Sequence, residues 1–535
     1  MQRIYKYIND NKPFFYFFFF YVVARIFLIN VNFTEWGDTF RMIRGASFLS
    51  NGSWPFDEKR LPFYSLLLVP GIWLNAEILW GRLLSLVSSF VTLLFVYLFY
   101  LKFISDNKKF ALLSVITLSL TSVFAYWSFR VMADPIFTTL IILFVYFFMS
   151  FNTSSKGKKL LTFKKVGILS FLLLVITMTR IEGAFLAFGV GLLFLIKRKW
   201  LDTFVVFIPQ VLIYVPWIIY TKLIYSGNIQ NDYFEEAKGF IFSFPRFEYF
   251  FSYTAFVLVV PCLIVFLIFG VSYWRKSKLF ESSLWLPLAT FLILELIVGF
   301  IWTPSLPRIY MPIIPFIVML SVFGIEKIDL YKHRILFIAA NLVSLGLFVY
   351  LQSSQKLYFL GASKLLFVLI IGSSILISVS AFLPNYFNRI VFGSVITLSV
   401  LISGIVIYNQ KNIYKTVKQG IDFINEDPGF TAYSDETGNT EWYLKDDSVY
   451  LPQNVQMEGE FQYRVLKKWN VKYLLWTNEF NRGSAFVDPK ADTRYTLLAV
   501  FKEEIKDPFD VLLNSLKMVK DESSQVFYTK VYLVN

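Results

Sequence analysis

Residues Asn32–Tyr64 read NFTEWGDTFRMIRGASFLSNGSWPFDEKRLPFY and separate the first two strongly apolar parts of the chain. This is the first stretch of the chain outside an apolar segment in which carboxylates, cations and tryptophans occur together. Asp38 opens a pattern in which apolar and basic residues alternate with helical spacing, as in a helix that lies at a membrane interface. Trp36 and Trp54 favour the same depth. We therefore expect Asp38 at the edge of the bilayer, either as the cap of that helix or as a functional carboxylate.

The composition predicts a polytopic α-helical membrane protein. Of 535 residues, 56% are hydrophobic, 20% are aromatic and only 16% are charged, whereas soluble domains carry about a quarter charged residues. Cys262 and His333 are the only residues of their kinds. This excludes an intramolecular disulfide, a Cys- or His-rich metal site and a His-based catalytic triad. Acid–base chemistry must therefore come from Asp, Glu, Lys or Tyr.

Apolar segments long enough to span a bilayer recur along the chain and predict about thirteen transmembrane helices. The first follows MQRIYKYINDNKP without a small-residue cleavage site and is expected to be a retained helix, not a signal peptide. Segment 61–76 contains Pro62 and Pro70 and is expected to be interfacial or re-entrant. The predicted spans are 14–31, 78–101, 110–127, 133–150, 165–178, 182–196, 202–221, 251–272, 284–301, 308–325, 335–351, 365–383 and 390–408.

The basic charge sets the predicted orientation. The net charge of +14 resides in short loops between apolar segments, which indicates membrane topology and contact with anionic lipid and excludes nucleic acid as the partner. Lys and Arg are denser in the loops on the side of the N-terminus. This places the N-terminus in the cytoplasm of a cell (inner) membrane, and an odd number of spans places the C-terminus outside.

Two domains are predicted: a transmembrane domain over 1–409, with its first outer loop at 32–76, and an extracytoplasmic α/β domain over 410–535. The second domain has about 125 residues, enough for its own core. Its expected strands are Lys472–Trp476, Tyr495–Phe501 and Phe527–Val534, and its expected helices are Ile413–Asn425 and Glu460–Trp469. The chain contains no phosphate-binding loop or dinucleotide motif, which argues against an ATP-driven transporter and against a nucleotide-sugar enzyme.

Under this topology, ionisable residues from several segments collect near the outer ends of the helices. Each has a structural explanation: a helix start at Asp134, a local pair between Arg180 and Glu182, a packing pair for Glu295 and an interfacial anchor at Arg308. Charges at membrane depth are costly, however, and usually pair or line a cavity. Their joint placement favours a site. The set is Asp38, Arg60, Arg130, Asp134, Arg180, Glu182, Glu295 and Arg308.

The motifs that carry these residues resemble those of the GT-C superfamily of polyprenyl-phosphate-sugar-dependent glycosyltransferases. The most similar branch contains the protein O-mannosyltransferases and the lipid A aminoarabinose transferases. Asp38 and Ala46 match the acidic helix D-E-x-x-Y-x-x-x-A of the first outer loop, whereas its Glu and Tyr are absent. The further matching motifs are GSW at 52–54, RLPFY at 60–64, RVMADP at 130–135, TRIEG at 179–183 and PRIYMP at 307–312.

The resemblance implies inverting transfer of a mannose-like hexose or a pentose from a polyprenyl-phosphate carrier to an acceptor hydroxyl on the outer face. It assigns Asp38 as the catalytic base. The cations expected to bind the donor phosphate are Arg60, Arg308, Arg130 and Arg180. The residues expected to contact the acceptor or to support the site are Asp134, Glu182, Glu35, Tyr64 and Tyr310.

Several questions stay open at this level. Carboxylate oxygens leave a divalent cation open as a cofactor, although no spacing requires one. The acceptor is a protein, a lipid or a glycan. The alternative function is a flippase or transporter of a lipid-linked glycan or a solute without covalent chemistry. The lack of repeated halves argues against that alternative.

Overall fold

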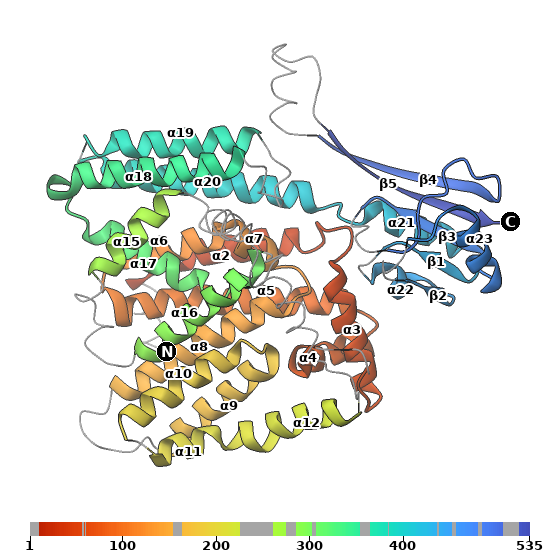
Figure 1. Ribbon diagram of the computed structural model, residues 1–535. Coiled ribbons are helices and arrows are strands. Elements are labelled where there is room, and N and C mark those ends of the chain that lie inside the picture. The colour runs from red at the N-terminus through yellow and green to blue at the C-terminus, as the bar shows by residue number, and fades with distance from the viewer. Residues whose placement is uncertain are drawn as a thin grey trace, which may run out of the picture. The chain divides into compact units, whose positions relative to one another are not determined.

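The protein is described here by a computed structural model whose internal contacts divide the chain into two units (Figure 1). The helical unit comprises Met1–Ile29, Gly45–Ala362 and Leu366–Val406, and the sheet unit comprises Asn30–Arg44, Ser363–Leu365 and Ile407–Asn535. The structure describes residues 10–55, 58, 60–153, 163–198, 200–224, 261–273, 285–301, 307–353, 364–383, 385–435, 438–451, 456–479, 484–506 and 524–535.

Over its described residues, the helical unit consists of α-helices with two π-helical turns and one 3-10 turn. Helix α3 (Gly37–Ser50) begins in the sheet unit and ends in the helical unit. The other elements are α2 (Lys12–Leu28), α4 (Pro62–Trp73), α5 (Glu77–Phe99), η1 (Tyr100–Ile104), α6 (Lys108–Leu120), α7 (Ser122–Trp127), α8 (Ala133–Thr153), α9 (Phe163–Thr179), α10 (Gly183–Ile196), α11 (Trp200–Pro209), η2 (Gln210–Tyr214), α12 (Val215–Ile224), α15 (Pro261–Tyr273), α16 (Leu286–Ile301), η5 (Pro307–Tyr310), α17 (Ile314–Lys327), α18 (Leu330–Ser353), α19 (Lys364–Ser380) and α20 (Phe387–Gln410).

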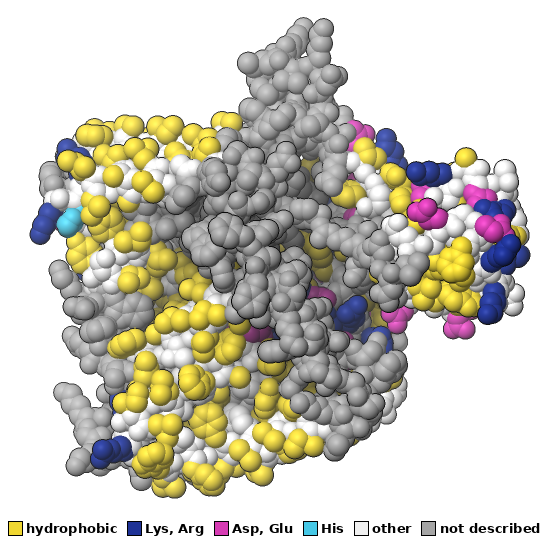
Figure 2. Space-filling view, viewed as in Figure 1, with side chains coloured by type: hydrophobic (Ala, Val, Ile, Leu, Met, Phe, Trp, Pro, Cys, Tyr) yellow, Lys and Arg dark blue, Asp and Glu magenta, His cyan; other side chains and the backbone are white. Residues whose placement is uncertain are grey.

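Within the described residues, four helices are long and apolar enough to cross a membrane: Glu77–Ile104, Ala133–Phe151, Thr203–Tyr220 and Phe387–Tyr408. Each coincides with a predicted span. Helix α4 has 12 residues, too few to cross the hydrocarbon core. The predicted total of thirteen spans stays a prediction: the helix described at the 182–196 span, α10, has 14 residues, and the start of the 251–272 span lies outside the described residues. Hydrophobic side chains cover much of the described surface of this unit (Figure 2), as expected for lipid contact.

The predicted span at 110–127 is divided into α6 and α7 by one extended residue, Thr121. Backbone carbonyls freed by such a break must find donors, because hydrocarbon supplies none. The Arg25 guanidinium donates a hydrogen bond to the carbonyl of Ser119, in the last turn of α6, at 3.4 Å and another to the carbonyl of Ala125 in α7 at 2.6 Å. The Ser403 hydroxyl donates one to the carbonyl of the last residue of α6 at 2.5 Å. Polar side chains of two other helices thus stabilise the break that precedes α8.

Helices α15 and α17 cross with their backbones in direct contact. A side-chain carbon at Gly270 would overlap the Leu320 carbonyl, and one at Gly324 would overlap the Phe266 carbonyl. Small residues permit this close approach in membrane helices, where packing replaces the hydrophobic driving force. The crossing holds α17, which follows η5, in a fixed position.

The sheet unit contains a mixed five-stranded sheet with strand order β2-β1-β3-β5-β4. Strand β1 pairs in parallel with β2 and β3, whereas β5 pairs antiparallel with β3 and β4. The three predicted strands and two predicted helices are confirmed, and the short β1, β2 and α22 are additional. The elements are α21 (Lys415–Ile424), β1 (Thr431–Tyr433), α22 (Asn439–Tyr443), β2 (Ser448–Val449), α23 (Gly459–Lys468), β3 (Tyr473–Thr477), β4 (Tyr495–Lys506) and β5 (Ser524–Val534).

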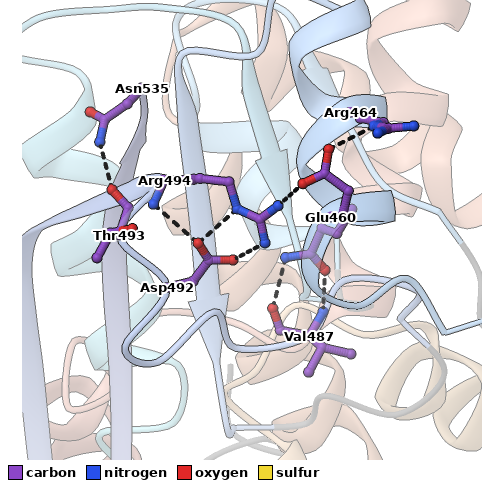
Figure 3. Close-up of polar contacts among 8 residues, drawn as sticks. Glu460, Arg464, Val487, Asp492, Thr493, Arg494 and Asn535 are labelled. Atoms are coloured by element: carbon purple, nitrogen blue, oxygen red, sulfur yellow. Dashed lines mark hydrogen bonds and ion pairs between the residues drawn. The ribbon is translucent and has the colours of Figure 1, made fainter.

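Helix α23 is tied to the start of β4 by a surface ion-pair network (Figure 3). The Arg494 guanidinium contacts the Asp492 carboxylate at 2.6 Å and also pairs with Glu460, which in turn pairs with Arg464. Exposed ion pairs of this kind contribute little to stability. The hydrophobic core beneath, which includes Leu466 and Tyr532, therefore supplies most of the stabilisation.

A buried carboxyl group lies just beyond the end of β3. Glu479 accepts a hydrogen bond from the Tyr414 backbone N–H at 2.7 Å and one from the Thr416 hydroxyl at 3.3 Å. Burial raises the pKa of Glu479 to about 7, and the nearby Asp435 adds to the effect, while the two hydrogen bonds oppose it. The folded unit thus favours the neutral form of this carboxyl group.

We predict that Glu479 makes the sheet unit less stable as the pH rises. The stability that its neutral form contributes is fully present below the ordinary pKa of 4.5 and is lost as the pH rises through about 7. This pKa difference corresponds to about 3 kcal/mol. Glu479→Gln should therefore raise the melting temperature of the full-length protein more at pH 8 than at pH 4.5. The exposed Glu426→Gln is the matched control. An equal effect of Glu479→Gln at both pH values would contradict the assignment.

Candidate active site

Helices α8, α9 and α10 bring together three charged residues from two of the sequence motifs. Asp134 lies in the first turn of α8, Arg180 follows the end of α9, and Glu182 precedes α10. The Arg180 guanidinium pairs with the Asp134 carboxylate and also with Glu182, at 2.5 Å and 3.2 Å. Contacts of one guanidinium group with two carboxylates fix both the position and the orientation of the side chains involved. We call these three residues, together with Glu295, the carboxylate cluster.

Glu295 of α16 is completely buried. Among the described residues, none donates a hydrogen bond to either of its carboxylate oxygens. It lies close enough to Glu182, Arg180 and Asp134 to interact electrostatically with all three. Three acidic groups therefore surround one guanidinium group in a buried setting, where burying a charge is costly. Such a cluster costs more free energy than packing alone requires, and clusters of this kind are frequent at functional sites.

Two further arginines lie on adjacent aromatic rings of α7. The Arg130 guanidinium lies 4.7 Å from the centre of the Tyr126 ring, and the Arg308 guanidinium lies 5.6 Å from that of Trp127. The two rings are themselves in edge contact, 4.8 Å apart. The electron-rich faces of the rings attract cations, so α7 holds two guanidinium groups from distant motifs on one platform. We call this the arginine platform.

The arginine platform and the carboxylate cluster are connected. Arg308 donates a hydrogen bond to the Met132 sulfur at 3.4 Å, and its charge interacts with that of Glu182. Met132 and Asp134 come from the same motif, RVMADP. Tyr310, which ends η5, is 1% exposed. The structure thus gathers the motifs RVMADP, TRIEG and PRIYMP, with Glu295 as an additional member.

The RLPFY motif contributes an ion pair that the sequence analysis did not predict. The Arg60 guanidinium donates a hydrogen bond to the Glu58 carboxylate at 3.0 Å, and the Arg60 backbone N–H donates to the same oxygen at 2.8 Å. Glu58 is 6% exposed. Tyr64 lies within α4 and is buried. The only sequence signal for this ion pair was that Glu58 and Arg60 lie two positions apart.

Asp38 and Glu35 belong to the sheet unit, whereas the other site residues belong to the helical unit. Asp38 is the second residue of α3, one place inside the helix and not at the cap position considered above, and it is partly exposed. Glu35 is completely buried. Within the described part of the chain, no group of three or more His, Cys, Asp and Glu is arranged to hold a metal ion.

Removal of the Arg180 guanidinium should strongly destabilise the helical unit. Arg180→Gln leaves the buried carboxylate of Asp134 and the half-buried carboxylate of Glu182 without their cation, and breaking a buried pair in this way costs about 3–5 kcal/mol. We expect a clear drop in melting temperature, most of it recovered when Asp134→Asn and Glu182→Gln are added. Arg464→Gln removes an arginine side chain that is 75% exposed and pairs with Glu460 on the surface. This control should change the melting temperature little. If Arg180→Gln lowered the melting temperature as little as Arg464→Gln does, the proposed electrostatic role of Arg180 would be contradicted.

Comparison with known proteins bears on the fold. No protein-family model and no curated protein matches the chain. The crystal structure of ArnT from Cupriavidus metallidurans bound to undecaprenyl phosphate matches with a TM-score of 0.58 at 13% identity, over 97% of this chain and 98% of that chain. The apo structure of the same protein matches with a TM-score of 0.56 at 12% identity, over 95% and 97%. The chain therefore has the fold of these ArnT structures over nearly its full length, and the resemblance drawn from the motifs is confirmed at the level of the fold.

Proposed function

We propose that this protein is an integral-membrane glycosyltransferase that takes a sugar from a polyprenyl-phosphate carrier and transfers it to an acceptor hydroxyl. The observation that carries the proposal is the gathering of the arginine platform and the carboxylate cluster within an ArnT-like fold. A lipid-linked phosphate needs cations at the depth where its headgroup lies. ArnT has been crystallised with undecaprenyl phosphate, which supports a carrier of this class.

The proposed chemistry is one inverting displacement. The acceptor oxygen attacks the anomeric carbon, the bond from that carbon to the phosphate oxygen breaks, and Asp38 takes the proton of the acceptor hydroxyl. Polyprenyl phosphate is the leaving group. Cations that stabilise the charge developing on that phosphate contribute strongly, because they are held in place before the reaction. We assign this role to Arg308, Arg130 and Arg60.

Arg180 has a different proposed role from the one expected. Its guanidinium is engaged by both Asp134 and Glu182, so its charge is already balanced by two carboxylates. We propose that Arg180 orients these carboxylates toward the acceptor rather than binding the donor phosphate. Tyr64, Tyr310 and the buried Glu35 support the surrounding structure in this proposal.

We further propose that the reaction takes place on the outer face of the membrane, with the N-terminus in the cytoplasm and the sheet unit outside. Lys and Arg side chains gather at one edge of the helical unit, near the start of α18 and the end of α10 (Figure 2). Loops with this enrichment face the cytoplasm in most membrane proteins. The proposed site residues come from other loops, which this topology places on the opposite face.

A sided transfer assay tests the proposal against the flippase alternative. Membrane vesicles of known orientation, with and without the protein, are given undecaprenyl phosphate linked to radiolabelled mannose, glucose or a pentose. An enzyme releases undecaprenyl phosphate and moves label into a product that no longer extracts as lipid-linked sugar. We expect this only when the donor reaches the outer face. Movement of intact donor across the bilayer, without product, would contradict the proposal and support the flippase.

We predict that Arg308→Ala impairs use of the donor. The substitution removes a charge-assisted contact with the phosphate, worth about 1.5–3 kcal/mol. The resulting loss in kcat/KM is about 10- to 150-fold. Arg389→Ala, which removes an exposed arginine from α20, should leave the kinetics unchanged. Unchanged kcat/KM in folded Arg308→Ala would exclude Arg308 from the donor site.

A further inference from the structure

The sheet unit includes a segment, Asn30–Arg44, that lies 407 − 44 = 363 positions before its C-terminal part, Ile407–Asn535. Asn30–Arg44, from the first outer loop, clusters with Ile407–Asn535 rather than with the helices on either side of it. The contact begins on the backbone, where the Phe33 N–H donates a hydrogen bond to the Lys411 carbonyl at 2.8 Å. Thr34 is buried, and its hydroxyl lies 3.3 Å from the Asn439 side-chain oxygen and 3.4 Å from the Tyr443 hydroxyl.

Helix α22 packs against the first turn of α3. The Phe40 ring meets the Tyr443 ring edge-on at 5.2 Å and lies 6.4 Å from Trp442. Gly438, directly before α22, has φ +79, which disfavours other residues. A side-chain carbon there would contact the Gly37 carbonyl at 3.7 Å, so the two helix starts approach closely. The short α22 therefore holds α3 at its N-terminal end.

A second contact holds the residue two places before Asp38. The Trp36 ring meets the Tyr414 ring edge-on at 6.1 Å. Tyr414 itself has a left-handed backbone, φ +55, and its N–H is fixed by the buried Glu479. Trp36 and Phe40, which lie two residues before and after Asp38, are thus both held by aromatic residues of the C-terminal part of the chain.

We propose that the C-terminal part of the sheet unit, Ile407–Asn535, positions the catalytic base. By holding Trp36 and Phe40, α22 and Tyr414 orient the first turn of α3, and with it the Asp38 carboxylate. This inference rests on the proposed function, because it assigns to Asp38 the proton-accepting role. Small displacements of a catalytic group are costly to turnover, and a site is held accurately only when its supporting contacts are rigid. This C-terminal part, in whose sequence we find no catalytic motif, is therefore required for catalysis. Tyr443 is a positioning residue.

Tyr443→Ala in the full-length protein tests this. It removes both the Thr34 contact and the packing on Phe40. We expect amide hydrogen exchange in residues 36–42 to accelerate at least about 10-fold, and kcat to fall at least about 10-fold. The KM for the labelled donor that the wild-type protein consumes should stay within about twofold, because Tyr443 is not a donor-binding residue. Tyr443→Phe keeps the ring on Phe40 and should recover most of kcat.

Tyr463→Ala is the matched control. Tyr463 is also a half-buried tyrosine of the sheet unit, but it packs on Tyr495 and Arg494. Tyr463→Ala should change neither amide hydrogen exchange in residues 36–42 nor kcat, even if it lowers the melting temperature as much as Tyr443→Ala does. If Tyr443→Ala does not fold, Thr34→Val replaces it as the test, because this substitution removes only the hydroxyl contacts. It should also accelerate amide exchange in residues 36–42 and lower kcat.

The outcomes separate this inference from the proposed function. Faster exchange in residues 36–42 with unchanged kcat would overturn the positioning role while the glycosyltransferase function stands. Unchanged exchange in Tyr443→Ala would overturn the contact itself. No turnover by the wild-type protein with any labelled donor would overturn the proposed function and the catalytic part of the inference together. The exchange comparison then still decides whether α22 holds the start of α3.

Discussion

The electrostatic cost of charge at membrane depth governs the helical unit. An unpaired ion there costs several kcal/mol, so charged side chains must pair, contact backbone carbonyls or reach aromatic faces. The described arginines use all three solutions. Arg180 pairs with Asp134 and Glu182, Arg25 donates to the Ser119 carbonyl that the α6–α7 break frees, and Arg130 lies on the Tyr126 ring. Glu295 is the exception, since no described residue donates a hydrogen bond to it.

These contacts also connect the helices that build the proposed site. Asp134 begins α8, Arg180 follows α9, Glu182 precedes α10 and Glu295 belongs to α16. One guanidinium group therefore fixes the ends of three helices and lies near a fourth. The arginine platform on α7 is joined to the same region through Met132 and Arg308. The polar groups that would bind a phosphate are thus held by the interactions that keep the helices together.

Much of the fold was predictable from the sequence, because hydrophobic segments of fixed length and strand-like runs are local signals. The helix start at Asp134 and the pair between Arg180 and Glu182 are also local. The contact between Asp134 and Arg180 joins residues 46 positions apart, and no local pattern specifies it. The same holds for Thr34 and Asn439, 405 positions apart. Strand β1 has only three residues, all buried, so it shows no alternation, and α22 has five.

The central claim is that Asp38 accepts a proton during sugar transfer, and one substitution tests it most directly. Asp38 is the second residue of α3, so Asp38→Asn keeps a side chain of the same size there and removes the carboxylate, at a cost to the helix start of no more than about 1 kcal/mol. Turnover of the purified variant is measured with a labelled polyprenyl-phosphate sugar, alongside its binding of undecaprenyl phosphate and its melting temperature. The account predicts turnover at least about 100-fold slower, with binding unchanged and stability nearly unchanged. Near-normal turnover would contradict it.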